Sequence, residues 1–181
     1  MPLKDCLLVQ LPINDNAITV RPFVAKDLTD TYVGWLNDAE VVRFSNQRFI
    51  SHSLSSCEAF YRSFEHASAC FLAVDHAELG MIGTMTVYFN EHHGTADIGI
   101  LIGERRVWGQ GIGLAAWCMI MEALKGVEGL RKITGGTLSC NLSMMSIFRR
   151  AGMIEDGIRY GQEVVAGVPY DIHHFAYFIH E

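Results

Sequence analysis

Hydrophobic and polar positions follow two periods along this chain, and together they predict one mixed domain of strands and helices. Runs rich in β-branched and aromatic residues, bounded by turn residues, predict strands. Apolar residues spaced three and four apart predict amphipathic helices. The expected strands cover residues 18–22, 70–75, 81–90, 95–102 and 132–138, and the expected helices cover 28–37, with Asp27 as N-cap, 53–66 and 113–125. Short polar links between the three middle strands predict an antiparallel meander.

The stretch 98–117, IGILIGERRVWGQGIGLAAW, stands at the centre of this pattern. A strand-like apolar run leads into a charged loop, then into glycines at every second position, and then into a run of good helix formers. A helix that begins after a glycine loop presents unpaired backbone N–H groups and the positive end of its dipole. Glycines also let an anion approach the backbone closely. The stretch therefore predicts a binding site for a phosphate-like group.

A dinucleotide site is one alternative, because residues 111–116 fit the pattern GxGxxA. That interpretation requires an acidic residue after the second strand of a βαβ unit. The expected strand 132–138 runs into Ser-Cys-Asn and carries no acid there. We therefore do not expect a Rossmann domain.

Composition restricts the class of protein. The chain has 181 residues, of which 50% are hydrophobic and 19% charged, and its formal net charge is −6. This balance argues against a broad nucleic-acid surface, which needs clustered Lys and Arg. No apolar run reaches membrane-spanning length, no signal peptide is evident, and the five cysteines are odd in number and lack CxxC spacing. We expect no membrane contact, no metal site, and a cytoplasmic location with reduced thiols.

The central stretch resembles the acyl-CoA motif (Q/R)xxGx(G/A) of the Gcn5-related N-acetyltransferase (GNAT) family. It is most similar to the Rim-type branch (RimJ/RimL-like), which commonly contains IGIxIGxxxxWGxGxG, and here Trp108 stands at the Gln/Arg position. The resemblance implies a single α+β domain over residues 1–181 with its core at about 18–178. Its central sheet would be mixed and mostly antiparallel, with about seven strands, about four flanking helices and a splayed strand pair that holds acyl-CoA.

The same resemblance implies that acetyl-CoA is the co-substrate. Asn141 matches an asparagine that in the family contacts the pantetheine arm or holds the following loop. Phe148 stands where many members have a tyrosine that acts as general acid, so Ser143, Ser146 or water would have to serve, or CoA leaves as thiolate. Of the serines we single out Ser146. The implied cofactor-binding residues are Leu101, Ile102, Gly109, Gln110, Gly111, Ile112, Gly113, Leu114 and Asn141.

Attack by an amine requires removal of a proton from its ammonium form. Asp97, Glu104 and His93 are the candidates for this base, each with simple surface charge as the alternative. We favour Asp97, because it precedes Ile98 at a place where Rim-type sequences often carry an acid.

Contacts to the acceptor are implied by a segment that resembles the Rim-type WlND…v.r pattern. They would involve Trp35, Asn37 and Arg48, although Trp35 also fits a core position. The function that follows is acetyl-CoA-dependent N-acetyl transfer to a primary amine by direct attack, either on a protein N-terminus or on a small amine such as an amino sugar nucleotide. A non-catalytic acyl-CoA-binding regulatory module is the alternative. A homodimer remains open.

Overall fold

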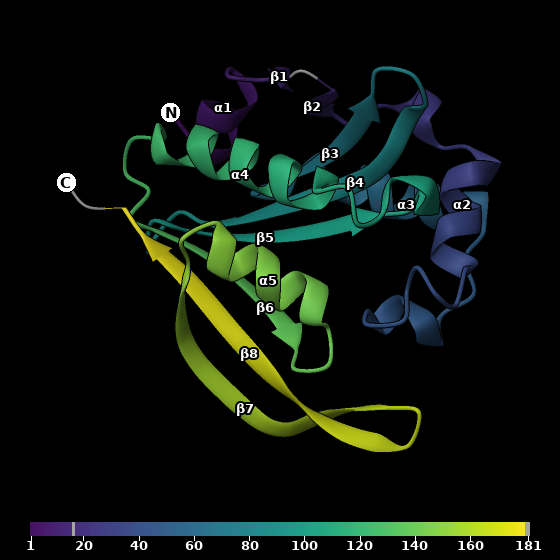
Figure 1. Cartoon of the computed structure of the whole chain (residues 1–181). Helices are drawn as coiled ribbons and strands as arrows, with labels where there is room; N and C mark the ends of the chain where they lie inside the picture. The colour runs from purple at the N-terminus through teal and green to yellow at the C-terminus, as the bar shows by residue number, and fades with distance from the viewer. Residues whose placement is uncertain (16, 180–181) are drawn as a thin grey trace.

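The computed structural model describes residues 1–15 and 17–179, and it contains one eight-stranded sheet with helices on both faces (Figure 1). The sheet order is β1-β2-β3-β4-β5-β6-β8-β7, and the pairing is antiparallel except between β5 and β6. The strands are β1 Ile13–Asp15, β2 Ile18–Pro22, β3 Ala69–His76, β4 Gly80–Asn90, β5 Thr95–Ile102, β6 Lys132–Leu138, β7 Ile154–Val165 and β8 Val168–Phe178. The α-helices are α1 Leu3–Leu8, α2 Asp30–Asn37, α3 Leu54–Ser63, α4 Ile112–Lys125 and α5 Leu142–Arg150.

Two hydrophobic clusters lie on opposite faces of the sheet. Neighbouring residues of a strand point to opposite faces, and on β3 Leu72 belongs to one cluster whereas Phe71 and Ala73 belong to the other. The first cluster joins the sheet to α1, α4 and α5, and the second joins it to α2 and α3. The predicted mixed, mostly antiparallel α+β architecture is confirmed.

The first 15 residues supply the helix and the strand that exceed the expected four helices and seven strands. Leu3 and Leu7 of α1 are buried in the first cluster. Lys4 donates from Nζ to the carbonyl oxygens of Phe64 and Ala67, at 2.7 and 3.0 Å. A six-residue helix is too short to show a clear period, so the sequence pattern does not predict α1. Because Leu3 and Leu7 belong to the first cluster, the packed core begins before the expected residue 18.

Asp27 does not cap α2, contrary to the sequence prediction. The helix begins three residues later, and the hydroxyl of Thr29 accepts a hydrogen bond from the backbone N–H of Tyr32 at 3.2 Å. Asp27 is buried, and its carboxylate accepts two hydrogen bonds from Arg21, at 2.6 and 2.9 Å, and one from the N–H of Val24. An acidic residue before a helix fits both roles in sequence, and the nearby arginine on β2 decides between them.

The parallel pair β5 and β6 separates after three residues. Asp97 and Thr134 form the last paired position, although β5 continues to Ile102 and β6 to Leu138. We call the diverging segments, residues 98–102 of β5 and 135–138 of β6, the splay. The connection between the two strands contains α4, and α5 follows β6, so both helices lie over the same face of the splay (Figure 1).

Asp27→Ala should lower the free energy of unfolding by about 2–3 kcal/mol, because it leaves the partly buried Arg21 and the Val24 N–H with fewer partners. Thr29→Ala should cost only about 1 kcal/mol, as loss of a helix cap. Urea unfolding of both variants measures the difference. Equal losses of unfolding free energy in the two variants would mean that Asp27 contributes no more than a helix cap does.

Candidate active site

The glycine loop before α4 has the backbone geometry of an open anion site. Gly109 and Gly111 have φ values of +75° and +84°, a region that L side chains rarely adopt. A Cβ atom at either position would meet no other heavy atom within 4 Å, so their conformation, and not crowding by the protein, requires glycine. Gly111 is the N-cap residue of α4 and offers no side chain to the free amides of the first turn, residues 112–114.

Side chains around this loop hold it in place. The indole Nε1 of Trp108 donates to the carbonyl of Ile102, at the end of β5, at 2.9 Å. Arg105 lies over the Trp108 ring at 5.6 Å, and the Gln110 amide donates to the carbonyl of Arg106 at 2.7 Å. The side chains of Trp108 and Gln110 therefore position the loop. The backbone N–H groups of Trp108 and Gln110 are bonded to the carbonyls of Arg105 and Val107, so Gly109, Gly111 and the first turn of α4 supply the amides available to an anion.

The loop comes close to the splay where α4, α5 and β5 meet. A Cβ atom on Gly113 would lie 3.3 Å from Cδ1 of Ile147 on α5 and 3.8 Å from Cγ1 of Ile102 on β5. Ile102 contacts the first cluster, whereas Leu101, its neighbour on β5, contacts the second. The expected cofactor-binding residues of β5 and α4 thus lie together, with Leu101 turned to the α2–α3 face.

Asn141 connects β6 to α5. Its side-chain oxygen accepts from the N–H of Met144 at 3.3 Å, and its Nδ2 donates to Oγ1 of Thr137 at 3.1 Å. Of the two family roles considered for this asparagine, the contacts within the chain correspond to holding the loop.

The α5 residues considered for the general acid lie in different places. Phe148 is fully buried, with ring-centroid distances of 5.2 Å to Trp117 and 4.8 Å to Phe175. Ser146 is exposed, whereas its neighbours Met145 and Ile147 contact the first cluster. Ser146 therefore points away from the splay, which argues against the acid role that we considered for it.

Asp97 lies at the vertex of the splay. Its Oδ1 accepts a hydrogen bond of 2.6 Å from the hydroxyl of Thr134 on β6. The side chain reaches solvent, but surrounding protein atoms desolvate the carboxyl and raise its pKa, while the Thr134 hydrogen bond and the charge of His174 act in the opposite direction. Tyr88, its partner on β4, also has a raised pKa, caused first by burial and then by the charge of Asp97.

The other two candidates for the base have different surroundings. Two hydrogen bonds from Arg106, at 2.9 Å each, hold the pKa of Glu104 down to about 2, which makes this carboxylate a weak base. His93 lies in the turn between β4 and β5, four residues before Asp97 and about 13 Å along the strand direction from the vertex. Asp97 is the one of the three at the point where the strands diverge.

The residues expected to contact the acceptor do not form one cluster. Trp35 is 8% exposed and packs against Gly103, which has no room for a Cβ. The side chain of Asn37 donates from Nδ2 to the carbonyl oxygen of His52 and accepts at Oδ1 from the His52 N–H, at 2.9 Å each. These contacts are structural, and a contact of either residue with the acceptor stays a prediction.

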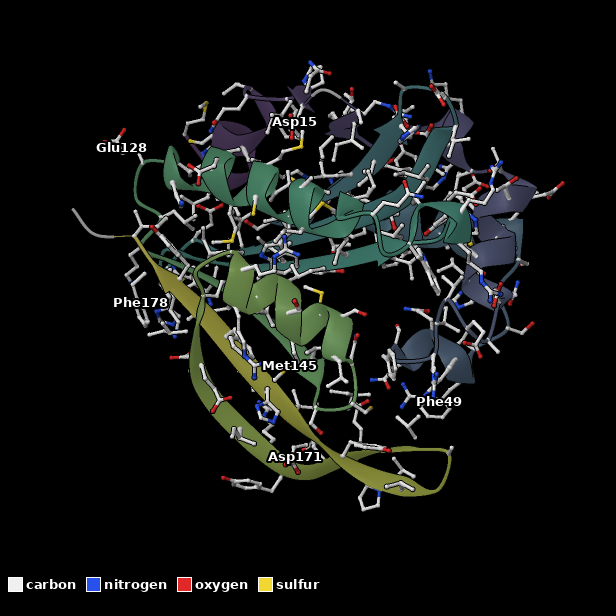
Figure 2. All side chains as sticks on the ribbon, in the orientation of Figure 1. Asp15, Phe49, Glu128, Met145, Asp171 and Phe178 are labelled. Atoms are coloured by element: carbon white, nitrogen blue, oxygen red, sulfur yellow. The ribbon has the colours of Figure 1, made fainter. Side chains whose placement is uncertain are left out.

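Arg48 links two segments that are far apart in sequence. It lies in the 3-10 turn Asn46–Phe49 and donates to the Ser45 carbonyl at 2.8 Å, to Glu163 at 3.4 Å and to the Val164 carbonyl at 3.3 Å. The last two residues belong to β7, so this arginine joins the region between α2 and α3 to the long hairpin. In Figure 2 the labelled Phe49 lies across from the hairpin that carries Asp171.

Thr134 and His174 are site neighbours that sequence reasoning missed. Their proximity to Asp97 depends on the register between β5, β6 and β8, for which a single sequence gives no signal. Within residues 1–15 and 17–179, no group of three or more His, Cys, Asp or Glu side chains is arranged to hold a metal. In the same described residues, no helix is long and apolar enough to cross a membrane.

Comparison with known proteins agrees with this geometry. The family model described as "Acetyltransferase (GNAT) domain" matches residues 17–154. No curated protein matches the chain significantly.

Solved structures share the fold at low sequence identity. A spermidine N-acetyltransferase from Vibrio cholerae, in complex with CoA and spermine, has a TM-score of 0.79 at 18% identity, with 91% of this chain and 96% of that chain covered. The ribosomal L7/L12 α-N-protein acetyltransferase RimL, in complex with CoA, has a TM-score of 0.79 at 14% identity, with the same coverage of 91% and 96%. The microcin C7 self-immunity acetyltransferase MccE, in complex with acetyl-CoA and AMP, has a TM-score of 0.77 at 17% identity and covers 91% and 94%. Because the family model spans most of the sequence and the splay and glycine loop lie within it, this chain belongs to the GNAT acetyltransferase family.

Proposed function

We propose that this protein transfers the acetyl group of acetyl-CoA directly to a primary amine. The observation that carries the proposal is the position of the glycine loop, whose free amides follow directly on the strand edge that β6 leaves unpaired. An anion bound at the loop and an extended arm along β5 would lie on one continuous path. This is the arrangement that a pyrophosphate joined to an amide-bearing chain requires.

In this proposal, acetyl-CoA is bound mainly by backbone groups and less by side chains. The amides of residues 109–114 would meet the pyrophosphate. The edge of residues 98–102 would bond the amides of the pantetheine arm, as an added strand does. From Ile102 back to Asp97 is five residues, or about 17 Å of strand, so an arm held this way would place its thioester near the vertex.

Asp97 is the residue to which the proposal assigns proton removal. Alkyl ammonium groups have pKa values of about 8 at a chain terminus and about 10 on a lysine-like side chain, so the acceptor arrives mostly protonated. Desolvation raises the pKa of Asp97 and so makes it a better base than a carboxylate in water.

Departure of CoA needs no tyrosine in this proposal. The ring of Phe148 cannot donate a proton, and Ser146 faces solvent. A thiol has an ordinary pKa of about 8.5, so a thiolate is a tolerable leaving group, and water can reprotonate it.

A primary amine is the acceptor class, and two kinds of acceptor fit it. The fold neighbours are named for spermidine and for the α-amino group of a ribosomal protein. The net charge of −6 favours a cationic small amine or a free polypeptide over an acceptor embedded in RNA. Mass spectrometry after incubation with acetyl-CoA and a panel of spermidine, an N-terminally free peptide and an amino sugar nucleotide identifies the acceptor. Acetyl-CoA binding without acetylation or thiol release for any amine would instead support a non-catalytic regulatory module.

Gly111→Asp should weaken acetyl-CoA binding at least ten-fold, because it adds a negative charge where the pyrophosphate approaches. Calorimetry on the folded variant measures the affinity. Gly129→Asp is a matched control: Gly129 has the same φ of +84°, and a Cβ atom there would make only an ordinary contact with Cδ2 of Leu3 at 3.9 Å, but it follows the opposite end of α4. Equal affinities in the two variants would place the cofactor elsewhere.

Asp97→Asn should preserve acetyl-CoA binding, lower kcat/KM by about 10²–10⁴ as expected for a lost acid–base group, and change the acidic limb of the pH profile. Steady-state kinetics across pH, with the fastest acceptor of the panel, provide the measurement. Activity within a few-fold of wild type with the same acidic limb would remove Asp97 from proton transfer.

A further inference from the structure

His174 lies on the same face of the sheet as Asp97. On β6, Thr134 pairs with Asp97 and Gly136 pairs with His174, and residues two apart on a strand share a face. A Cβ atom on Gly136 would be only 3.2 Å from Nδ1 of His174. The imidazole therefore lies over β6 at Gly136, two residues along that strand from Thr134.

The second ring nitrogen of His174 is unused by the fold. Its Nε2 is buried and has no hydrogen-bond partner among residues 1–15 and 17–179. Buried polar atoms are nearly always paired, and an exception calls for an explanation. This buried nitrogen, on the face of the sheet that carries Asp97, therefore needs a partner, which a group of a bound substrate would supply.

We propose that the imidazole of His174 accepts the proton of the acceptor ammonium and that Asp97, held by Thr134, stabilises the imidazolium that forms. This inference rests on the proposed acetyl transfer and deepens it. His174 is then the residue that takes the proton directly, and Asp97, to which proton removal is assigned above, acts through it as a positioning residue.

The step balances in protons and electrons. One ammonium N–H bond breaks, its proton moves to Nε2, and the electron pair stays on the amine nitrogen. That pair forms the new C–N bond at the thioester carbonyl, and the C–S bond breaks with its electron pair on sulfur. A second proton leaves the nitrogen and ends on the thiolate, giving free CoA, and His174 returns its proton to solvent.

Acidity explains why the imidazole suits this step better than a carboxylate alone. Ordinary pKa values are about 4 for aspartate, about 6.5 for imidazole and about 8–10 for amines. Proton transfer from the ammonium group to imidazole is therefore less unfavourable than transfer to aspartate. A neighbouring carboxylate also favours the protonated ring, as it does in hydrolase triads. The charge of His174 acts to lower the pKa of the Asp97 carboxyl, and the same attraction favours the protonated ring.

The other charges around His174 leave this coupling in place. Lys132 of β6 is neutralised by Asp156 of β7 at 2.6 Å. Arg159 of β7 pairs with Ile172, two residues from His174, and its side chain is exposed. Asp97 of β5 and Tyr88 of β4 also face this side, and so do Tyr170 of β8 and Glu163 of β7, whose carboxylate contacts Arg48 at 3.4 Å.

His174→Gln tests the proposal, and His173→Gln is its matched control. His173 is adjacent on β8 but faces the other side of the sheet, where it contacts Glu155 at 2.8 Å. With the fastest amine of the panel, His174→Gln should keep acetyl-CoA affinity, lose about 10²-fold in kcat/KM at neutral pH and lose the acidic limb. His173→Gln should keep the limb. Asp97→Asn should move the limb to lower pH, because an unsupported imidazolium is more acidic.

The opposite assignment predicts a different set of profiles. If Asp97 were itself the proton acceptor, the limb would disappear in Asp97→Asn and persist in His174→Gln, which would overturn the proposal while leaving acetyl transfer intact. A wild-type protein that acetylates no amine would instead refute the proposed function.

NMR titration of the wild-type protein bound to CoA tests the role of His174 without relying on the folding of any variant. The imidazole of His174 should titrate at the midpoint of the acidic limb, and a midpoint more than one pH unit away would overturn its role.

Discussion

The hydrogen bonds between β5 and β6 stop at Asp97 and Thr134, although both strands continue beyond that point. Backbone donors and acceptors inside a protein are almost always paired, so an open edge in the middle of a sheet calls for a partner. Elsewhere the ladder is complete: residues 83–90 of β4 cover the other edge of β5, and β8 covers β6 along its whole length. The unpaired edge therefore lies on one side of β5 only, and it can accept an extended, amide-bearing chain.

The glycine loop follows β5 after residues 103–108, and Trp108 connects its start to the end of the strand. Trp108 bonds back to the last carbonyl of the strand, and Gly113 lets α4 come within van der Waals contact of Ile147 and Ile102. A side chain at Gly109 or Gly111 would be strained by its positive φ. The sequence spacing of glycines thus serves two needs at once, a left-handed turn before the helix and a close contact just after its start.

The strands that could be predicted from the sequence are those whose pattern is local. Residues 95–102 and 132–138 alternate or run apolar between clear turns, and the structure has the same bounds. The role of Asp27 could not be predicted, because it depends on Arg21 and on Asp75 of the neighbouring strand. The family resemblance anticipated the splay, but the vertex partners of Asp97 depend on the register of strands separated by long stretches of chain, and a slip of one residue would turn them to the other face.

Alternation along β5 divides the work of the site between two faces. Ile98, Ile100 and Ile102 face α4 and α5, where acetyl-CoA is expected, whereas Asp97 and Gly99 face the side of α2 and α3. Gly99 and Gly136 make room on that second face for two other side chains, because a Cβ atom would lie 2.6 Å from Oγ1 of Thr86 at Gly99 and 3.2 Å from Nδ1 of His174 at Gly136. In the proposed reaction, a cofactor held from one face and an acceptor arriving from the other would meet where β5 and β6 diverge. A larger residue at either glycine would clash with Thr86 or His174, so it would disturb this second face without touching the cofactor loop.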